Sequence, residues 1–374
     1  MQRLVLVSAS AAALAAGAGA ALAAAPGPAP TARNVVLFLA DAGGLPTLHA
    51  ASVHAYDDPR RLFLHTLPHV ALAETSSASE WVTDSAAAMT AIVTGHKTHN
   101  GVVSQSSAAV RRLKDGEPVK TILEHAEERG LATGVVTNSS VLSATPAACY
   151  AHVNDRGNEV EVLRQLLKPR FGDGVDVVIG DGLPDVVEAA TAAGLTWRDA
   201  LRQARLEPYD SLEEVPAGVR RAAVLFDGDF DLGLAVQRAI DVLSRNPNGF
   251  FLMVESNVHA GNIAATLDRV VLTDRAVRSV AERLPGDTLV LFTADHSYDF
   301  RIYDGRKGEP LLAGTAPGYG EDVDSLRLLN VRRDGDHTAE DVVVAALGPG
   351  AERVRGFLSN TDLFHIMMAA YGWR

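Results

Sequence analysis

The chain has 374 residues, of which 47% are hydrophobic and 21% are charged. This length and composition are typical of one large α/β domain or two small ones. Acidic residues outnumber basic residues by 46 to 34, which gives a formal net charge of −12 and argues against nucleic acid as a partner. Cys149 is the only cysteine, so an exported form of this chain would have no intramolecular disulfide.

The first 25 residues have the composition of a secretory signal peptide. Arg3 precedes a run rich in Ala, Leu and Val, and Ala-x-Ala sites end at Ala23 and Ala25. The run is too weakly apolar for a membrane anchor, and no later stretch has the length of a membrane span. We therefore expect export to the periplasm or the medium, with residues 1–25 removed, a Pro/Ala linker at residues 26–33 and one catalytic domain at residues 34–374.

Residues 80–95 combine a polar lead-in, Ser85 and an Ala-rich run with strong helix propensity. This pattern places Ser85 at a helix N-terminus, where unpaired backbone N–H groups and the helix dipole favour an anion. The hydroxyl at such a position has two interpretations, a helix cap and a catalytic nucleophile.

Nearly continuous apolar runs, typical of strands buried on both faces of a parallel sheet, recur along the chain. They lie at residues 34–40, 133–137, 175–180, 222–226, 249–255 and 288–294. A helix is expected from Pro118 to Glu128, with Pro118 in its first turn. Together with the next strand this helix gives a βα-type alternation.

Acids and one histidine stand where three of these runs end. Asp41 follows the first run, Glu255 closes another, and Asp295 and His296 follow the last. Burying a lone carboxylate is costly, so Glu255 must be paired, protonated or bound to a metal. The Asp–His pair is a plausible metal site. Seen in isolation, Asp41 and Asp295 fit equally well as turn or capping residues.

These and later motifs together resemble the alkaline phosphatase family. Residues 83–87 are similar to its nucleophile motif, residues 143–156 to its second block, and residues 337–342 to its His-Thr-Gly-Glu-Asp block. The motifs follow the family's order from Asn34 to about Tyr371, and the resemblance is weak across residues 181–245. It implies an α/β three-layer sandwich, with a mostly parallel central sheet and helices on both faces.

The resemblance implies a phosphomonoesterase in which Ser85 attacks a phosphate monoester and carries the phosphoryl group as a covalent phosphoserine. It also implies that Arg156 grips phosphate oxygens, which suits a planar guanidinium. Judged alone, Arg156 could equally form a surface ion pair with Asp155 or Glu159. The implied metal ligands are Asp41, Thr145 and Glu255 for Mg²⁺, Asp41, Ser85, Asp295 and His296 for one Zn²⁺, and His337 with His259 for a second Zn²⁺.

The second zinc site departs from the family. Val258 and Asn262 align with the Asp and His that bind this zinc in relatives, and His259 is the only strong ligand type left in the loop. We therefore expect the metal near His337 to be bound more weakly than the other zinc. Ser143 stands where relatives carry Asp or His, which leaves the metal preference of the magnesium site open.

Two alternatives stay open. The first is a sister enzyme, a sulfatase or a phosphodiesterase; residues 85–89 lack the sulfatase motif, and diesterases usually use Thr and lack the block around Arg156. The second is a catalytically weakened phosphate- or metal-binding relative, which the departures at Val258 and Asn262 support. The expected partners are small-molecule phosphate monoesters, with no membrane contact after signal cleavage. The oligomeric state stays open, with a homodimer among the options.

Overall fold

The computed structural model describes residues 31–259, 261–284, 286–312, 325–327 and 330–374. The signal peptide and residues 26–30 of the linker, both expected from the sequence, lie outside these ranges. None of the helices in the described ranges is long and apolar enough to cross a membrane.

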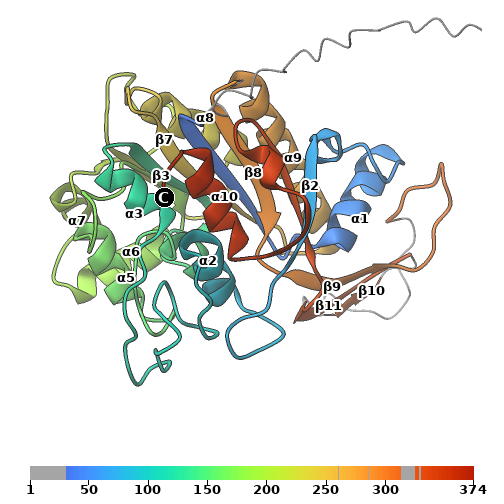
Figure 1. The fold of residues 1–374 in the computed structure, drawn as a ribbon, viewed down its shortest axis with the longest axis horizontal. Helices are drawn as coiled ribbons and strands as arrows, with labels where there is room; N and C mark the ends of the chain where they lie inside the picture. Colours follow the sequence, from blue (N-terminus) through green and yellow to red (C-terminus); the bar gives the residue numbers. More distant parts are fainter. Residues whose placement is uncertain (1–30, 260, 285, 313–324, 328–329) are drawn as a thin grey trace, which may run out of the picture.

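A ten-stranded sheet forms the centre of the described chain, in the order β13-β2-β12-β8-β1-β7-β3-β4-β6-β5 (Figure 1). In this sheet β12 runs antiparallel to both of its neighbours, and the other pairings are parallel. Its strands are β1 (Asn34–Asp41), β2 (His69–Glu74), β3 (Ala132–Ser140), β4 (Val177–Asp181), β5 (Glu207–Tyr209), β6 (Ala222–Leu225), β7 (Phe250–Asn257), β8 (Thr288–Ala294), β12 (Val342–Leu347) and β13 (Gly356–Ser359).

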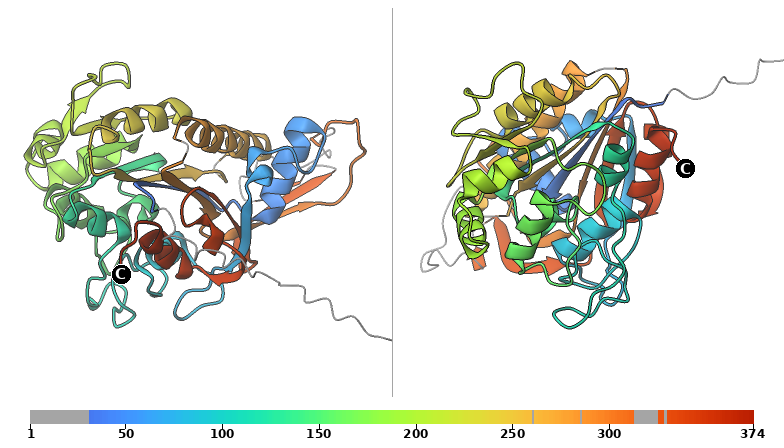
Figure 2. Two further views of the ribbon diagram at one scale, coloured as in Figure 1. Left: turned by 45° about the horizontal axis from the view of Figure 1, so that its top comes forward. Right: turned by 90° about the vertical axis from the view of Figure 1, so that its left-hand side faces the viewer.

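Helices cover both faces of this sheet (Figure 2), which confirms the predicted three-layer α/β fold. One face carries α1 (Leu45–Tyr56), α8 (Leu232–Leu243) and α9 (Ile263–Arg283). The other face carries α2 (Ser85–Thr94), α3 (Ile122–Glu128), α4 (Ala144–Ala147), α5 (Glu159–Leu167), α6 (Leu183–Ala192), α7 (Trp197–Gln203) and α10 (Asp362–Ala370). Short 3₁₀ turns lie at Phe63–Thr66 and Ala351–Arg353.

Strand β1 shows why its sequence is apolar throughout. Because successive side chains of a strand point to opposite faces, Leu37 and Leu39 enter the core on the side of α2, whereas Val36 and Phe38 enter the core on the side of α9. All four side chains are fully buried. A strand covered on both faces needs this continuous pattern.

The helix expected from Pro118 to Glu128 begins later than predicted, at Ile122. Thr121 caps it, because its hydroxyl accepts from the N–H of Glu124 while the Glu124 carboxylate accepts from the N–H of Thr121. This capping box fixes the helix start. Pro118 and Val119 are extended instead, bridged to the segment at Ser104 and Gln105.

A second sheet supplies the remaining wall of the site. It contains β9 (Ser297–Ile302), β10 (Ser325–Arg327) and β11 (Val331–Thr338), in the order β10-β11-β9. Strand β9 begins shortly after β8 ends, so this small sheet extends from the carboxyl end of β8 (Figure 1). The carboxyl ends of β1, β7 and β8, the start of α2 and the end of β11 converge there, at the edge where open α/β sheets bind ligands.

Candidate active site

Ser85 is the first residue of α2, and it does not cap the helix. Asp84 performs that role, because its carboxylate accepts from the backbone N–H of Ala87 at 3.0 Å. The Ser85 side chain is left for other contacts. It is 4% exposed, and its Oγ lies 3.4 Å from Nε2 of His296. Of the two interpretations of this hydroxyl, the helix cap is therefore wrong.

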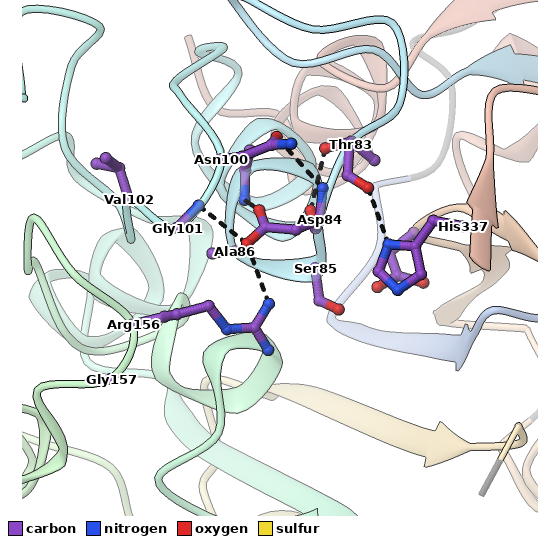
Figure 3. A network of polar contacts seen from close by, with 12 residues as sticks. Thr83, Asp84, Ser85, Ala86, Asn100, Gly101, Val102, Arg156, Gly157 and His337 are labelled. Atoms are coloured by element: carbon purple, nitrogen blue, oxygen red, sulfur yellow. Dashed lines mark hydrogen bonds and ion pairs between the residues drawn. The ribbon is translucent and has the colours of Figure 1, made fainter. Parts of the chain in front are cut away.

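Arg156 is turned toward Ser85 by the same aspartate. Its guanidinium donates to Oδ2 of Asp84 at 3.1 Å, and the backbone N–H of Gly101 donates to the same oxygen at 2.9 Å (Figure 3). The alternative ion pair with Asp155 is absent among the described contacts, because Asp155 binds Arg111 and Arg112 instead. Figure 3 shows the Ser85 side chain between Arg156 and His337.

His296 directs one ring nitrogen at three oxygen atoms. Its Nε2 lies 3.3 Å from Oδ2 of Asp295, 3.4 Å from Oγ of Ser85 and 3.6 Å from Oδ1 of Asp41. Its Nδ1 lies 3.2 Å from the carbonyl oxygen of Ser297. A carbonyl can only accept, so Nδ1 is the donor in this contact, and Nε2 is the nitrogen that faces the three oxygens.

Two carboxylate oxygens at this point are buried without a hydrogen bond from the described chain, Oδ1 of Asp41 and Oδ2 of Asp295. Such oxygens are costly unless something else compensates them. Asp41, Asp295 and His296 offer ligand atoms that all lie within 4.8 Å of one another. Two carboxylates and an imidazole suit zinc, so these residues fit a metal ion.

The pKa values of the two acids in this cluster are shifted in opposite directions. Burial and the charge of Asp41 raise the pKa of Asp295 to about 6. Burial alone would also raise the pKa of Asp41, but His259, His296 and His337 outweigh it and hold that pKa at about 2. Asp41 therefore carries the more persistent negative charge.

Glu255 lies on the neighbouring strand. In the β1–β7 pairing it stands opposite Leu39, two residues before Asp41. Its carboxyl accepts from the hydroxyls of Thr137 and Thr145, while burial and the charge of Asp41 raise its pKa to about 8. Hydroxyl and carboxylate oxygens are the donors that Mg²⁺ prefers. The structure thus brings Glu255 and Thr145 into contact, as the resemblance implied.

His337 and His259 lie beside this cluster. The Nδ1 of His337 donates to the carbonyl of Thr83 at 3.0 Å, and its ring stacks on His296 with centroids 3.6 Å apart. The Nε2 of His259 is 3.5 Å from Oδ1 of Asp41. In the described ranges the only group of three close ligands is the Asp41 cluster, so these two histidines do not gather a third acid or histidine around themselves.

The two positions that depart from the family serve the fold. Val258 is fully buried in the apolar core below α9. Asn262 caps α9, because its side chain accepts from the N–H of Ala265 at 2.9 Å. A histidine at position 262 would remove this cap, so the loop does not offer Asn262 as a simple replacement for the missing ligand.

Sequence reasoning missed several side chains that position the site. Asp84 could have been found, because an Asp before an Ala-rich run is a typical helix cap. Arg333 could not. It is 2% exposed and donates to the carbonyls of His259 and Gly261 at 2.8 and 2.6 Å, which holds the loop that carries His259. Nothing in the local sequence of Arg333 indicates this contact.

Comparisons with known proteins show the family of this chain. The alkaline phosphatase family model matches residues 32–185 and 229–319. The chain belongs to the alkaline phosphatase family. This alkaline phosphatase is 30% identical to the enzyme of Escherichia coli K12, over 91% of this chain and 86% of the relative. It is 31% identical to the streptomycin-6-phosphate phosphatase of Streptomyces griseus, over 92% and 91% of the two chains.

The fold agrees with solved alkaline phosphatases as well. The structure of the enzyme from the Antarctic bacterium TAB5 matches with a TM-score of 0.75 and 26% identity, over 93% of this chain and all of that chain. A variant of the same enzyme was solved with Mg bound in a site called M3. The chain is thus a phosphoric monoester hydrolase of a metal-dependent family, as the motifs predicted. The family match omits residues 186–228, within the stretch where the resemblance is weak.

The raised pKa of Glu255 predicts how pH affects the metal-free protein. Burial and Asp41 raise this pKa from 4.5 to about 8, so between these values the folded chain holds a proton that the unfolded chain has lost. Stability should therefore fall as pH rises from about 4.5 to 8. Thermal melts of metal-free protein should show a falling Tm over this range, with a flatter profile for Glu255→Gln.

Two controls test this assignment. Glu127 is also buried with a pKa raised to about 8, and Glu127→Gln should flatten the profile too. The exposed Glu282→Gln should leave the slope as in the wild type. If Glu255→Gln keeps the full wild-type slope, Glu255 is not the group that responds.

Proposed function

We propose that this alkaline phosphatase hydrolyses phosphate monoesters through a covalent phosphoserine on Ser85. The observation that carries the proposal is the placement of Ser85. Its buried hydroxyl begins α2 and lies 3.4 Å from His296, on the Asp41, Asp295 and His296 cluster. A nucleophile needs this combination of a helix N-terminus for the phosphate and a neighbouring site that activates the hydroxyl.

The side chains then act in a simple order. Arg156 and the first N–H groups of α2 hold the phosphate oxygens, with Asp84 orienting the Arg156 guanidinium. The Ser85 oxygen attacks phosphorus and loses its proton, and the bond from phosphorus to the substrate oxygen breaks, so an alcohol leaves with a proton. Water then attacks the phosphoserine, which releases inorganic phosphate and returns a proton to Ser85.

Three metal positions support this chemistry in the proposal. Asp41, Ser85, Asp295 and His296 would hold one zinc ion, and Asp41, Thr145 and Glu255 would hold magnesium. His337 and His259 would hold a second zinc ion. When bound, zinc supplies Lewis acidity that lowers the pKa of the attacking hydroxyl and stabilises oxygen charge. Negative charge from Asp41, Asp295 and Glu255 compensates these cations.

A second candidate function remains, a relative with weakened catalysis that still binds phosphate or metal. Val258 and Asn262 favour it, because both are committed to the fold rather than to a metal. Turnover of a chromogenic phosphate monoester by purified, metal-analysed protein separates the two candidates.

We also propose that the chain is exported and cleaved after Ala23 or Ala25. The apolar, small-residue composition of residues 1–25 supports this. Intact-mass measurement of the exported protein should give a chain that starts at residue 24 or 26. A mass that includes Met1 would contradict the proposal.

Ser85→Ala should remove nearly all phosphomonoesterase turnover, at least about a thousandfold, because the nucleophile is lost while the metal ligands on β1 and β8 remain. The Tm should stay within a few degrees of the wild type, because Asp84 rather than Ser85 caps α2. Steady-state kinetics and thermal melts measure both effects, with the exposed Ser244→Ala as a control. If the Ser85→Ala variant kept about a tenth of the wild-type kcat, Ser85 would not be the nucleophile.

Limited chelation should remove the metal near His337 before the metal held by Asp295 and His296. The latter is held by two carboxylates, whereas His337 and His259 lack an anionic partner of their own apart from the shared Asp41. Metal analysis during stepwise chelation, with activity followed in parallel, measures the order of loss. Two zinc ions that leave together would show that the loop supplies ligands we have not identified.

A further inference from the structure

Two arginines next to Arg156 share one carboxylate. Nε of Arg111 lies 3.0 Å from Oδ1 of Asp155, and Nε of Arg112 lies 2.6 Å from Oδ2. In the hydrogen bonds of the described residues, neither side chain uses its terminal nitrogens. The two side chains are 43% and 69% exposed. A guanidinium has five N–H donors, so each arginine can still bind an anion in the forked geometry that suits phosphate or carboxylate.

Only Gly101 separates Arg111 from Asp84, the residue that precedes Ser85. The guanidinium of Arg111 packs against Gly101, where a Cβ would collide with it. Gly101 in turn donates its N–H to Oδ2 of Asp84 at 2.9 Å and accepts from the backbone N–H of Arg156 at 2.8 Å. A contact path therefore runs from Arg111 through Gly101 to Asp84 and the start of α2.

Arg112 lies in a closed turn that is hydrogen-bonded to the residue before Asp155. Arg112 has a φ of +63°, a left-handed conformation that is uncommon for a residue other than glycine. The turn is closed by two backbone hydrogen bonds between Val110 and Lys114, each 2.9 Å long, and Arg112 donates its N–H to the carbonyl of Asn154 at 3.4 Å.

Three arginines share two carboxylates around Arg156. Arg111, Arg112 and Arg156 face two carboxylates, Asp84 and Asp155, and the nearby Asp115 accepts instead from the amide of Gln105 at 3.1 Å. Exposed guanidinium groups of this kind attract anionic ligands and repel cationic ones.

We infer that Arg111 and Arg112 form a second anion subsite, and that the preferred substrates are phosphate monoesters whose alcohol part carries another phosphate or carboxylate. The first phosphate lies at Ser85 and Arg156, and the second anionic group binds the terminal nitrogens of the arginine pair. This inference rests on the proposed function, because it takes Ser85 as the group that attacks the first phosphate.

Matched substrates test the inference. Propane-1,3-diol monophosphate and bisphosphate differ only in the second anion, the phosphate ester of 3-hydroxypropanoate replaces it by a carboxylate, and longer diol bisphosphates vary the spacing. In the wild type kcat/KM should favour a bisphosphate over its monophosphate. Arg111→Gln and Arg112→Gln should each lower this ratio about threefold, and the double variant about tenfold, since exposed charge pairs have modest effects. Added salt should lower the wild-type ratio.

The control is Arg278→Gln, an exposed arginine that pairs with Glu282 on α9 and should leave both rates as in the wild type. An unchanged ratio in the double variant would overturn the inference. So would an equal fall for both substrates, because the arginines would then serve only to hold Asp155 and Arg156. Failure of the proposed function is distinguishable, since it shows as full activity of Ser85→Ala on either substrate.

Discussion

The site depends on the compensation of negative charge that is buried where three hydrophobic strands end. Asp41, Glu255 and Asp295 come from β1, β7 and β8, which are neighbours in the sheet, and all three side chains are buried. Parallel strands in register bring their carboxyl ends together, so these acids are forced into one small volume. The resulting repulsion is costly unless protons or cations relieve it. The histidines and the proposed metal ions at this site both compensate this negative charge.

The surrounding elements supply the relief from different directions. His296 follows β8, His337 comes from β11, and His259 reaches Asp41 from the loop after β7. Strand β11 acts twice, because it carries both His337 and the buried Arg333 that holds the His259 loop. Helix α2 adds its N-terminus, whose dipole favours an anion, and Asp84 both caps this helix and orients Arg156.

Much of this could be predicted from the sequence, for physical reasons. Apolar runs that end in acids show both a buried parallel strand and its carboxyl end, so Asp41, Glu255 and Asp295 are found together. The helix before Gly130 was predicted to start at Pro118, because proline is common in a first helical turn. It starts later, at Ile122, because the reciprocal hydrogen bonds of Thr121 and Glu124 fix the helix start there. The contacts of Arg333, Arg111 and Arg112 could not be predicted, because their partners lie more than 40 residues away in the sequence. Local sequence patterns contain no information about such distant partners.

The two positions after β7 at which the resemblance led us to expect ligands serve the fold instead. Val258 now contributes to the apolar core and Asn262 caps α9, so restoring Asp and His there would bury an acid in the core and remove a helix cap. Each reversal costs stability before any metal is bound. The remaining imidazole, His259, is held 3.5 Å from Asp41 by a loop that Arg333 fixes from behind. A tighter second metal site would therefore be obtained more easily by changes around His259 and Arg333 than at Val258 and Asn262.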